Sequence, residues 1–184
     1  MPASSAVKWD GQQAGKKPVI GVTWYDALAY CDWLKKVTGR NYTLPNEAQW
    51  EKACRGGKTS IYPWGDTFDA GRCNFGRTEI TTVDAYPAQN EFECFDLVGN
   101  IRQWTCTLWG EKRPMPDLNY EYPWREDGGR NNIKANRQIR RVLRGASLNE
   151  RSQDLLRCSS RRGELPDDPG LPGFYHGFRV AIAK

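Results

Sequence analysis

The sequence predicts an α+β fold, and three features of the chain predict it. Residues 23–38 and 46–55 show helical spacing of apolar side chains, no helical period returns after residue 57, and short apolar segments follow near the C-terminus. The length of 184 residues, with 39% apolar and 12% aromatic residues, is typical of one packed domain. We expect a flexible leader in residues 1–17 and a domain of two helices, short irregular strands and long loops in residues 18–184.

The first predicted helix has signals at both ends. Thr23 is followed three residues later by Asp26, which is close to a capping box. Gly39 stands where a helix ends. The apolar residues recur with helical spacing and predict one buried face, formed by Trp24, Leu28, Cys31 and Leu34.

The second predicted helix follows in "LPNEAQWEKACRGG". Asn46 and Gln49 can cap its N-terminus, and the pair of glycines at 56–57 ends it. Its inward-facing residues are expected to be Trp50, Ala53 and Cys54.

The rest of the chain predicts loops and short strands. "REDGGRNNIKANRQ" has the composition of a surface loop, whereas "RRVLRGAS" and "GFRVAIAK" resemble strands. The segment between those two strands mixes Arg, Asp, Glu, Pro and Gly without a period. Long loops need large side chains beneath them, so we expect four rings to be largely buried: Trp24, Trp50, Trp64 and Trp104.

Composition excludes several classes of protein. No apolar run reaches the length of a membrane-spanning helix, and residues 1–17 lack the apolar core of a signal peptide, so the default expectation is a cytoplasmic protein. The six cysteines form no CxxC pair and there is one histidine, which argues against a zinc site. We expect the cysteines to be small buried hydrophobes; an oxidised framework is the alternative.

Several segments, in order, resemble the formylglycine-generating enzyme (sulfatase-modifying factor) family. They are "PVIGVTWYDALAYCDWL", "YTLPNEAQWEKACRGG", "YPWGD", "CNFGRT", "VDAYP", "NEFECFDLVGNIRQWT" and "RVLRGAS…RCSSR…GFRV". They span roughly residues 18–182. The resemblance implies a C-type-lectin-like fold.

The sequence departs from the family at its catalytic residues, which implies that the family's oxidase chemistry is missing. Family oxidases use a cysteine pair just after the turn that corresponds to residues 145–147. The sequence here holds no cysteine between Ala146 and Leu156, and Cys158 matches a framework position. No residue is therefore assigned a catalytic role.

A calcium site of the family falls on "DLVGNIRQW". The resemblance implies Asp96 and Gln103 as side-chain ligands and the backbone oxygens of Gly99 and Ile101 as further ligands. A glutamate is usual where Gln103 stands, and its loss removes a charge that calcium favours. The site could hold calcium; the alternative is that Asp96 and Asn100 brace a turn. No other cofactor is expected.

The C-terminal segment resembles the variable proteins of diversity-generating retroelements, a branch of this fold. In them, the segment between an "RVLRG"-like strand and the terminal "GFRV" forms a variable ligand-binding surface. The resemblance implies such a surface in residues 145–178. The residues expected to point outward and bind a ligand are Leu148, Asn149, Arg151, Ser160, Arg162, Leu165, Tyr175 and His176.

The framework that would hold this surface follows from the same resemblance. Guanidinium groups can satisfy several loop carbonyls at once, so Arg144, Arg157 and Arg179 are expected to brace it. The remaining framework positions are Gly145, Ser147, Cys158, Arg161, Gly177 and Phe178.

Three functions compete. The first is a non-catalytic display module that binds a protein ligand. The second is a formylglycine-generating or related oxidase. The third is a polyanion or nucleic-acid binder that uses the arginines of residues 128–163; the sequence lacks the interleaved aromatic and basic residues of single-strand binders, which disfavours nucleic acid. Residues 1–17 show no counterpart of the family's first strands, so an uncovered sheet edge could mediate association. No membrane partner is expected.

Overall fold

The structure is a computed structural model that describes residues 15–117, 120, 129–170, 172 and 174–183. It is α+β, as the sequence predicts. Its elements are α1 (Trp24–Thr38), β1 (Tyr42–Thr43), α2 (Glu47–Arg55), η1 (Ala70–Arg72), β2 (Arg102–Gly110), β3 (Arg140–Arg144), η3 (Gln153–Leu156), β4 (Arg161–Glu164), β5 (His176–Phe178) and β6 (Ala181–Ile182).

Both helices begin and end where their sequence signals predict. Thr23 caps α1 and Asn46 caps α2, each in a reciprocal capping box with the residue three positions on. Gly39 and Gly56 end them in the left-handed conformation, with φ of 71° and 60°. Within the described residues, no helix is long and apolar enough to cross a membrane.

A four-stranded sheet of order β4-β3-β2-β5 organises the domain. β2 is antiparallel to β3 and parallel to β5, and β3 is antiparallel to β4. The sequence did not reveal β2 as one strand. All nine of its residues are buried, so the strand lacks the alternation of apolar and polar side chains that marks a half-exposed strand.

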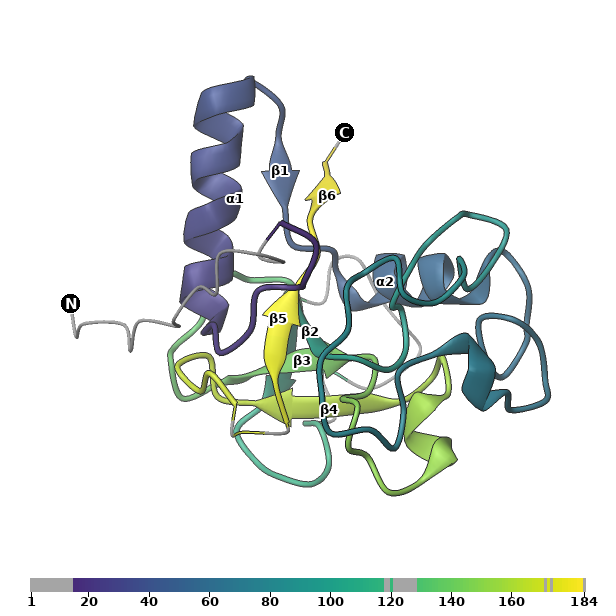
Figure 1. Cartoon of the computed structure of the whole chain (residues 1–184). Helices are drawn as coiled ribbons and strands as arrows, with labels where there is room; N and C mark the ends of the chain where they lie inside the picture. Colours follow the sequence, from purple (N-terminus) through teal and green to yellow (C-terminus); the bar gives the residue numbers. More distant parts are fainter. Residues whose placement is uncertain (1–14, 118–119, 121–128, 171, 173, 184) are drawn as a thin grey trace.

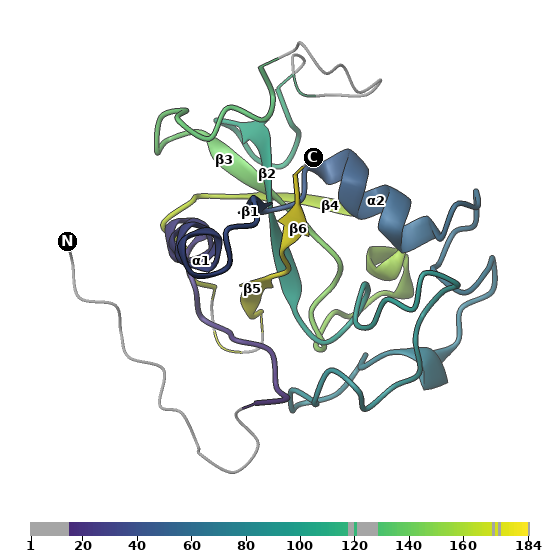
Figure 2. The same ribbon diagram turned by 90° about the horizontal axis from the view of Figure 1, so that it is seen from above.

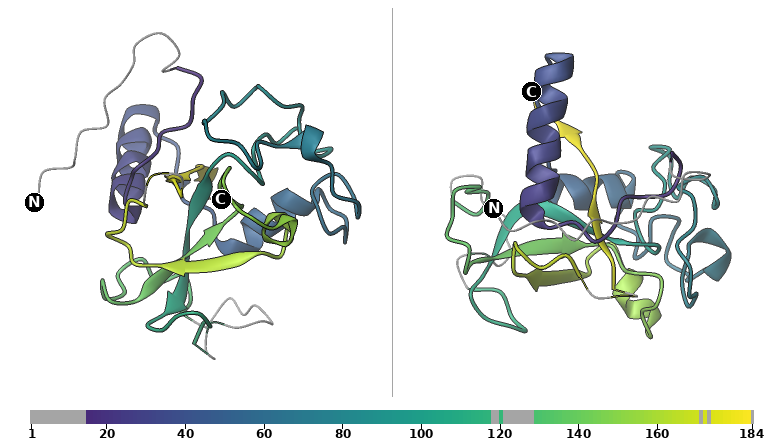
Figure 3. Two further views of the ribbon diagram at one scale, coloured as in Figure 1. Left: turned by 60° about the horizontal axis from the view of Figure 1, so that its bottom comes forward. Right: turned by 60° about the vertical axis from the view of Figure 1, so that its left-hand side comes forward.

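A second sheet pairs β1 with β6 near the C-terminus. Figures 1 and 2 show α1 on one side of this pair and α2 on the other. The long connection between α2 and β2 forms loops that extend beyond the end of α2 and return past it to β2 (Figures 1 and 3). The loops are therefore gathered around a small ordered centre.

Two apolar clusters form the core. One packs α1 against β2 and β3 through Trp24, Cys31, Leu44, Trp104 and Leu143. The other packs α2 beneath the loops and includes Trp50, Tyr62, Leu97, Leu156 and Cys158. Burial of Trp24, Trp50 and Trp104 is confirmed, with exposed fractions of 0–1%, whereas Trp64 is only partly buried at the edge of the second cluster.

The predicted leader lies mostly outside the described residues. Within it, Lys16 is described and is held in place. The Lys16 carbonyl accepts a hydrogen bond of 2.9 Å from the Val83 amide, and the Lys16 ammonium lies 2.8 Å from the carboxylate of Asp84.

Candidate ligand-binding site

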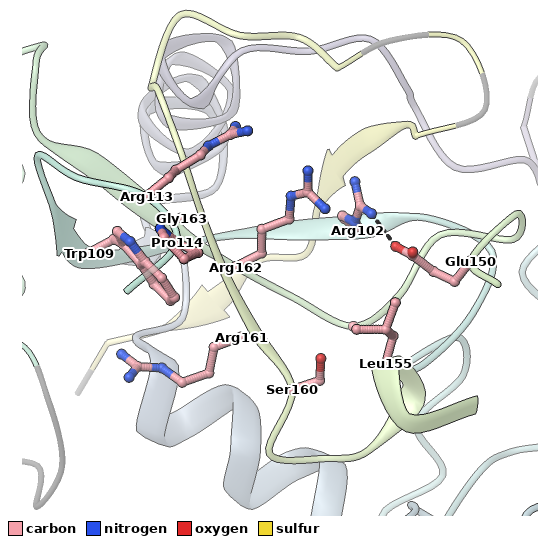
Figure 4. Close-up of a pocket in the computed structure, with 11 residues that line it drawn as sticks. Arg102, Trp109, Arg113, Pro114, Glu150, Leu155, Ser160, Arg161, Arg162 and Gly163 are labelled. Atoms are coloured by element: carbon pink, nitrogen blue, oxygen red, sulfur yellow. Dashed lines mark hydrogen bonds and ion pairs between the residues drawn. The ribbon is translucent and has the colours of Figure 1, made fainter. Parts of the chain in front are cut away.

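The candidate site is a pocket of about 380 Å³ that the C-terminal segment forms with β2 and the loop after it. Figure 4 shows the β4 ribbon crossing it. The lining combines cationic, apolar and small residues: Arg102, Trp109, Arg113, Pro114, Gly145, Glu150, Leu155, Ser160, Arg161, Arg162 and Gly163. Its size is at the lower end of the range of small-molecule sites.

Strand pairing brings the lining residues together. β4 pairs with β3 so that Leu143 lies opposite Arg162 and Val142 lies opposite Gly163. A side chain at Gly163 would overlap the indole of Trp109, so only glycine lets this ring pack against the β4 backbone. Trp109 in turn lies under the Arg161 guanidinium, 5.3 Å from its ring centroid.

Arg144 is the centre of the framework beneath the pocket, as predicted. Its buried guanidinium donates hydrogen bonds to the carbonyls of Cys158, Ser159 and Ser160 at 2.5, 3.2 and 2.8 Å. It also donates to the Glu51 carboxylate at 2.7 Å. One side chain therefore fixes the path of the loop that leads into β4.

Glu47 completes this framework from α2. Its carboxylate is fully buried and pairs with the Arg161 guanidinium, with a hydrogen bond of 2.7 Å to Arg161 Nη2. Glu47 also lies 3.4 Å from Arg144. Glu47 was not predicted, because its partners are about a hundred residues away along the chain.

Arg179 also satisfies loop carbonyls, as predicted. Its Nη2 donates to the carbonyls of Phe95 and Asp96 at 3.0 and 3.2 Å, and its Nε donates to Gln103 Oε1 at 2.5 Å. Burial lowers the pKa of the Arg179 guanidinium.

The framework role predicted for Arg157 is wrong. Its side chain is 49% exposed and pairs only with Asp154, three residues away, among the described residues. The "RCSS" turn is instead held by Arg144 and by the hydrogen bond of 2.8 Å from the Cys158 amide to the Ile61 carbonyl.

The predicted outward residues divide into three groups. Arg162 and Ser160 line the pocket. Arg151 is exposed but does not line it. Asn149, Leu165 and Tyr175 are half-buried.

The outward placement predicted for Leu148 and His176 is wrong. Leu148 is 1% exposed, and its backbone bonds to Asn100 and Arg77 tie it to the neighbouring loops. His176 is 2% exposed on β5 and packs edge-on against Trp104, with ring centroids 5.2 Å apart. Burial lowers the pKa of the His176 imidazole to about 4. Both residues belong to the core.

Sequence reasoning missed several lining residues that lie outside the C-terminal segment. Arg102 begins β2, Trp109 is its penultimate residue, and Arg113 lies in the following loop. Glu150 lies within the segment but was not among the predicted binding residues, and it is buried against Arg102 as an ion pair. The available signal was charge at Arg102, which is an ionisable residue close to the apolar Ile101 and Trp104.

The loop that the family resemblance assigns to calcium does not fit the ion. Gln103 Oε1 already accepts hydrogen bonds from Trp50 Nε1 at 2.8 Å and from Arg179 Nε at 2.5 Å. The Asp96 carbonyl accepts from Gln103 Nε2 and Arg179 Nη2 at 2.6 and 3.2 Å. The Arg179 cation therefore lies where an oxygen-rich cation site would have to form.

The remaining implied ligands belong to a tight turn. Asp96, Gly99 and Asn100 have φ of 48°, 86° and 61°, and the Asp96 carboxylate accepts a hydrogen bond of 2.8 Å from the side-chain Nδ2 of Asn100. Burial raises the pKa of Asp96 to about 6. Ile101 is buried next to this turn. These contacts support the alternative in which the segment braces a loop.

The cysteines do not contribute to the pocket. None of the described residues that line it is a cysteine. Cys54 and Cys158 are free and fully buried, with their Sγ atoms 2.8 Å apart. Burial raises the pKa of the Cys54 thiol, which disfavours the reactive thiolate.

The fold and these matched segments define a C-type-lectin-like domain of the formylglycine-generating type. The chain belongs to the family described as the sulfatase-modifying factor enzyme 1-like domain, which it matches over residues 2–184.

Curated relatives are similar over most of the chain. It is 33% identical over 168 residues to the inactive C-alpha-formylglycine-generating enzyme 2 of Bos taurus, a match that covers 82% of the chain and 46% of that protein. It is 34% identical over 167 residues to the serine/threonine-protein kinase pkn1 of Chlamydia pneumoniae, which covers 90% of the chain and 24% of the kinase. The chain thus spans less than half the length of these two relatives.

Solved structures share the fold. Treponema denticola variable protein 1 superposes with a TM-score of 0.69 at 21% identity, over 96% of the chain and 75% of that structure. PvdO from Pseudomonas aeruginosa superposes with a TM-score of 0.67 at 24% identity, over 91% of the chain and 62% of that structure.

Proposed function

We propose that this chain is a non-catalytic module that binds a protein ligand in the pocket formed by its C-terminal segment. The observation that carries the proposal is the combination of a pocket lined by Ser160 and Arg162 with a rigid framework centred on Arg144. Binding loops require such a scaffold, because a loop that is ordered before binding loses less conformational entropy.

The likeness to a variable protein supports the same function. The predicted variable segment, residues 145–178, contributes most of the pocket lining. We propose that variation that changes the ligand is confined to side chains that face the pocket, such as Ser160 and Arg162. Leu148 and His176 are core residues and are expected to remain fixed.

An oxidase is the weaker candidate. A thiol mechanism needs an accessible thiolate, whereas the described pocket lining has none and Cys54 and Cys158 are buried. The similarity to a relative named inactive agrees with this ranking.

Selection of dodecapeptides by phage display, followed by binding to matched variants, tests the proposal. Arg162→Ala removes a pocket side chain, and Arg151→Ala removes an exposed arginine outside the lining. We expect Arg162→Ala to abolish binding of the selected peptides and Arg151→Ala to leave it unchanged, with both variants folded. Recovery of no peptides, or of peptides that bind both variants equally, would refute the proposal.

A further inference from the structure

The pocket carries a row of guanidinium groups from three separate segments. Arg102 comes from the start of β2, Arg113 from the loop after β2, and Arg162 from β4. Figure 4 shows the three guanidinium groups side by side along one wall of the pocket. Arg161 points away from this row, toward the partners described above (Figure 4).

Nearby carboxylates do not neutralise this row. Within the described part of the chain, Glu150 pairs with Arg102, and Glu164 is the carboxylate within 4 Å of Arg113 and Arg162. Glu164 pairs with Arg113, lies 3.1 Å from Arg140, and lies 3.9 Å from Arg162. Among the described residues, these four arginines face Glu150, Glu164 and the more distant carboxylate of Asp168, which leaves an excess of one positive charge in this cluster.

The positively charged arginine side chains lie close to one another, and some of them are shielded from water. The Arg102 side chain is only 4% exposed, and burial together with the neighbouring Arg162 and Arg113 charges lowers the pKa of Arg102. Burial and the nearby Arg140 and Arg162 charges lower the pKa of Arg113 as well. An anion in the pocket would relieve this repulsion.

Two of the guanidinium groups are accessible to a ligand. The side chains of Arg113 and Arg162 are 43% and 48% exposed. Among the described residues, the only carboxylate within 4 Å of Arg162 is that of Glu164, at the long distance of 3.9 Å. The planar fork of Arg162 is therefore available for a carboxylate, which guanidinium groups bind in a bidentate manner.

Apolar groups complete the lining. Trp109, Pro114 and Leu155 lie in the same pocket as the arginines, and Leu155 is 41% exposed. Trp109 is 5% exposed and is covered by Arg161, so its face is not free to stack on a base. The lining thus favours a peptide carboxylate beside an apolar side chain over a nucleic acid.

We propose that the ligand of this pocket is an acidic peptide segment whose Asp or Glu carboxylate binds the Arg113–Arg162 pair while an adjacent apolar side chain contacts Leu155. This inference rests on the proposed function and specifies its ligand. The buried Arg102–Glu150 ion pair lines the pocket beside these two arginines.

Small probes test the carboxylate directly. N-acetyl-glutamate methylamide and its glutamine counterpart are titrated at low salt while the Arg Nε–Hε signals are followed by NMR. We expect saturable shifts of the Arg162 and Arg113 signals with the glutamate probe alone. Equal responses to both probes, or no saturable shift, would overturn the inference.

Matched variants locate the binding. Arg162→Gln is expected to weaken binding of the glutamate probe roughly tenfold, because a hydrogen bond to a charged group is lost. Arg151→Gln is expected to leave the affinity for this probe unchanged. An equal loss in both variants would indicate general charge attraction and would count against the site. Tighter binding of inorganic pyrophosphate than of the glutamate probe would instead identify a phosphate site and overturn the peptide assignment.

The selected dodecapeptides separate this inference from the proposed function. Peptides that depend on Arg162 but carry no acidic residue would preserve the function and refute the inference. Binding of the glutamate probe at Arg162 without any pocket-dependent peptide would support the anion site and refute the protein-ligand function.

Discussion

Replacement of Arg144 by alanine is expected to destabilise the fold severely, because this side chain joins three parts of the molecule. Its guanidinium is 0% exposed and bonds to three consecutive carbonyls, those of Cys158, Ser159 and Ser160. It also contacts the Glu51 carboxylate and lies 4.9 Å from the centroid of the Trp50 ring.

The expected loss follows from what the variant leaves behind. Removal of one partner from a buried ion pair costs about 3–5 kcal/mol, and each buried acceptor left unpaired adds about 1–3 kcal/mol unless water reaches it. These terms are not additive, so we expect a loss of at least about 3 kcal/mol against a typical total of roughly 5–15 kcal/mol. Arg144→Lys keeps the charge but not the planar fork and should lie between wild type and alanine.

Urea denaturation followed by tryptophan fluorescence measures this loss. Arg157→Ala is the matched control, because its side chain is 49% exposed and its ion pair with Asp154 is expected to contribute about 0–1 kcal/mol. A loss below about 1 kcal/mol for Arg144→Ala, or an equal loss in the two variants, would refute the reasoning.

Three further predictions follow from buried groups. Trp104→Ala should lower the free energy of unfolding by roughly 3–5 kcal/mol in urea, and a loss below about 1 kcal/mol would contradict its place in the core. The pKa of His176 is about 4 in the folded protein and 6.5 ordinarily, so the unfolded chain binds more protons than the folded one between these pH values. Wild type should therefore lose stability relative to His176→Gln as the pH falls from 6.5 to about 4. Parallel curves of unfolding free energy against pH for the two proteins would contradict this. Asp96, whose pKa is raised to about 6, acts in the opposite direction but is present in both proteins and cancels in the comparison. Because Gln103 Oε1 already accepts two hydrogen bonds, calcium and EGTA should give the same melting temperature, and a rise with calcium would contradict the contacts of this turn.

The helices could be predicted because their signals are local. A cap, an apolar face and a terminal glycine all lie within one segment, and Thr23 and Gly39 fulfil the roles that their positions predict. β2 and β4 have no such signals. β2 is buried on both faces, and the charged sequence of β4 becomes a strand only because β3 supplies its hydrogen-bond partners.

The candidate site could be predicted only in the part that the C-terminal segment supplies. Ser160 and Arg162 were expected and line the pocket, whereas Arg102 and Arg113 arrive from β2 and the loop after it. The direction of a side chain depends on strand register and packing, which composition does not encode. His176 illustrates this, because the parallel pairing of β5 with β2 turns it inward against Trp104.

In the irregular C-terminal segment, buried residues that hold the framework alternate with exposed residues that form the binding surface. Leu148, Leu156 and Cys158 anchor it in the core, while Arg151 and Arg162 between and after these anchors remain exposed. A regular helix or strand would repeat one burial pattern and would bring its exposed residues to a single face. Because the segment has no regular period, outward side chains can lie between the buried anchors. β4 lies at the edge of the sheet, where Arg162 faces the pocket. Changes at outward positions that line the pocket, such as Arg162, are expected to alter binding with little effect on the fold, whereas changes at the anchors are expected to do the reverse.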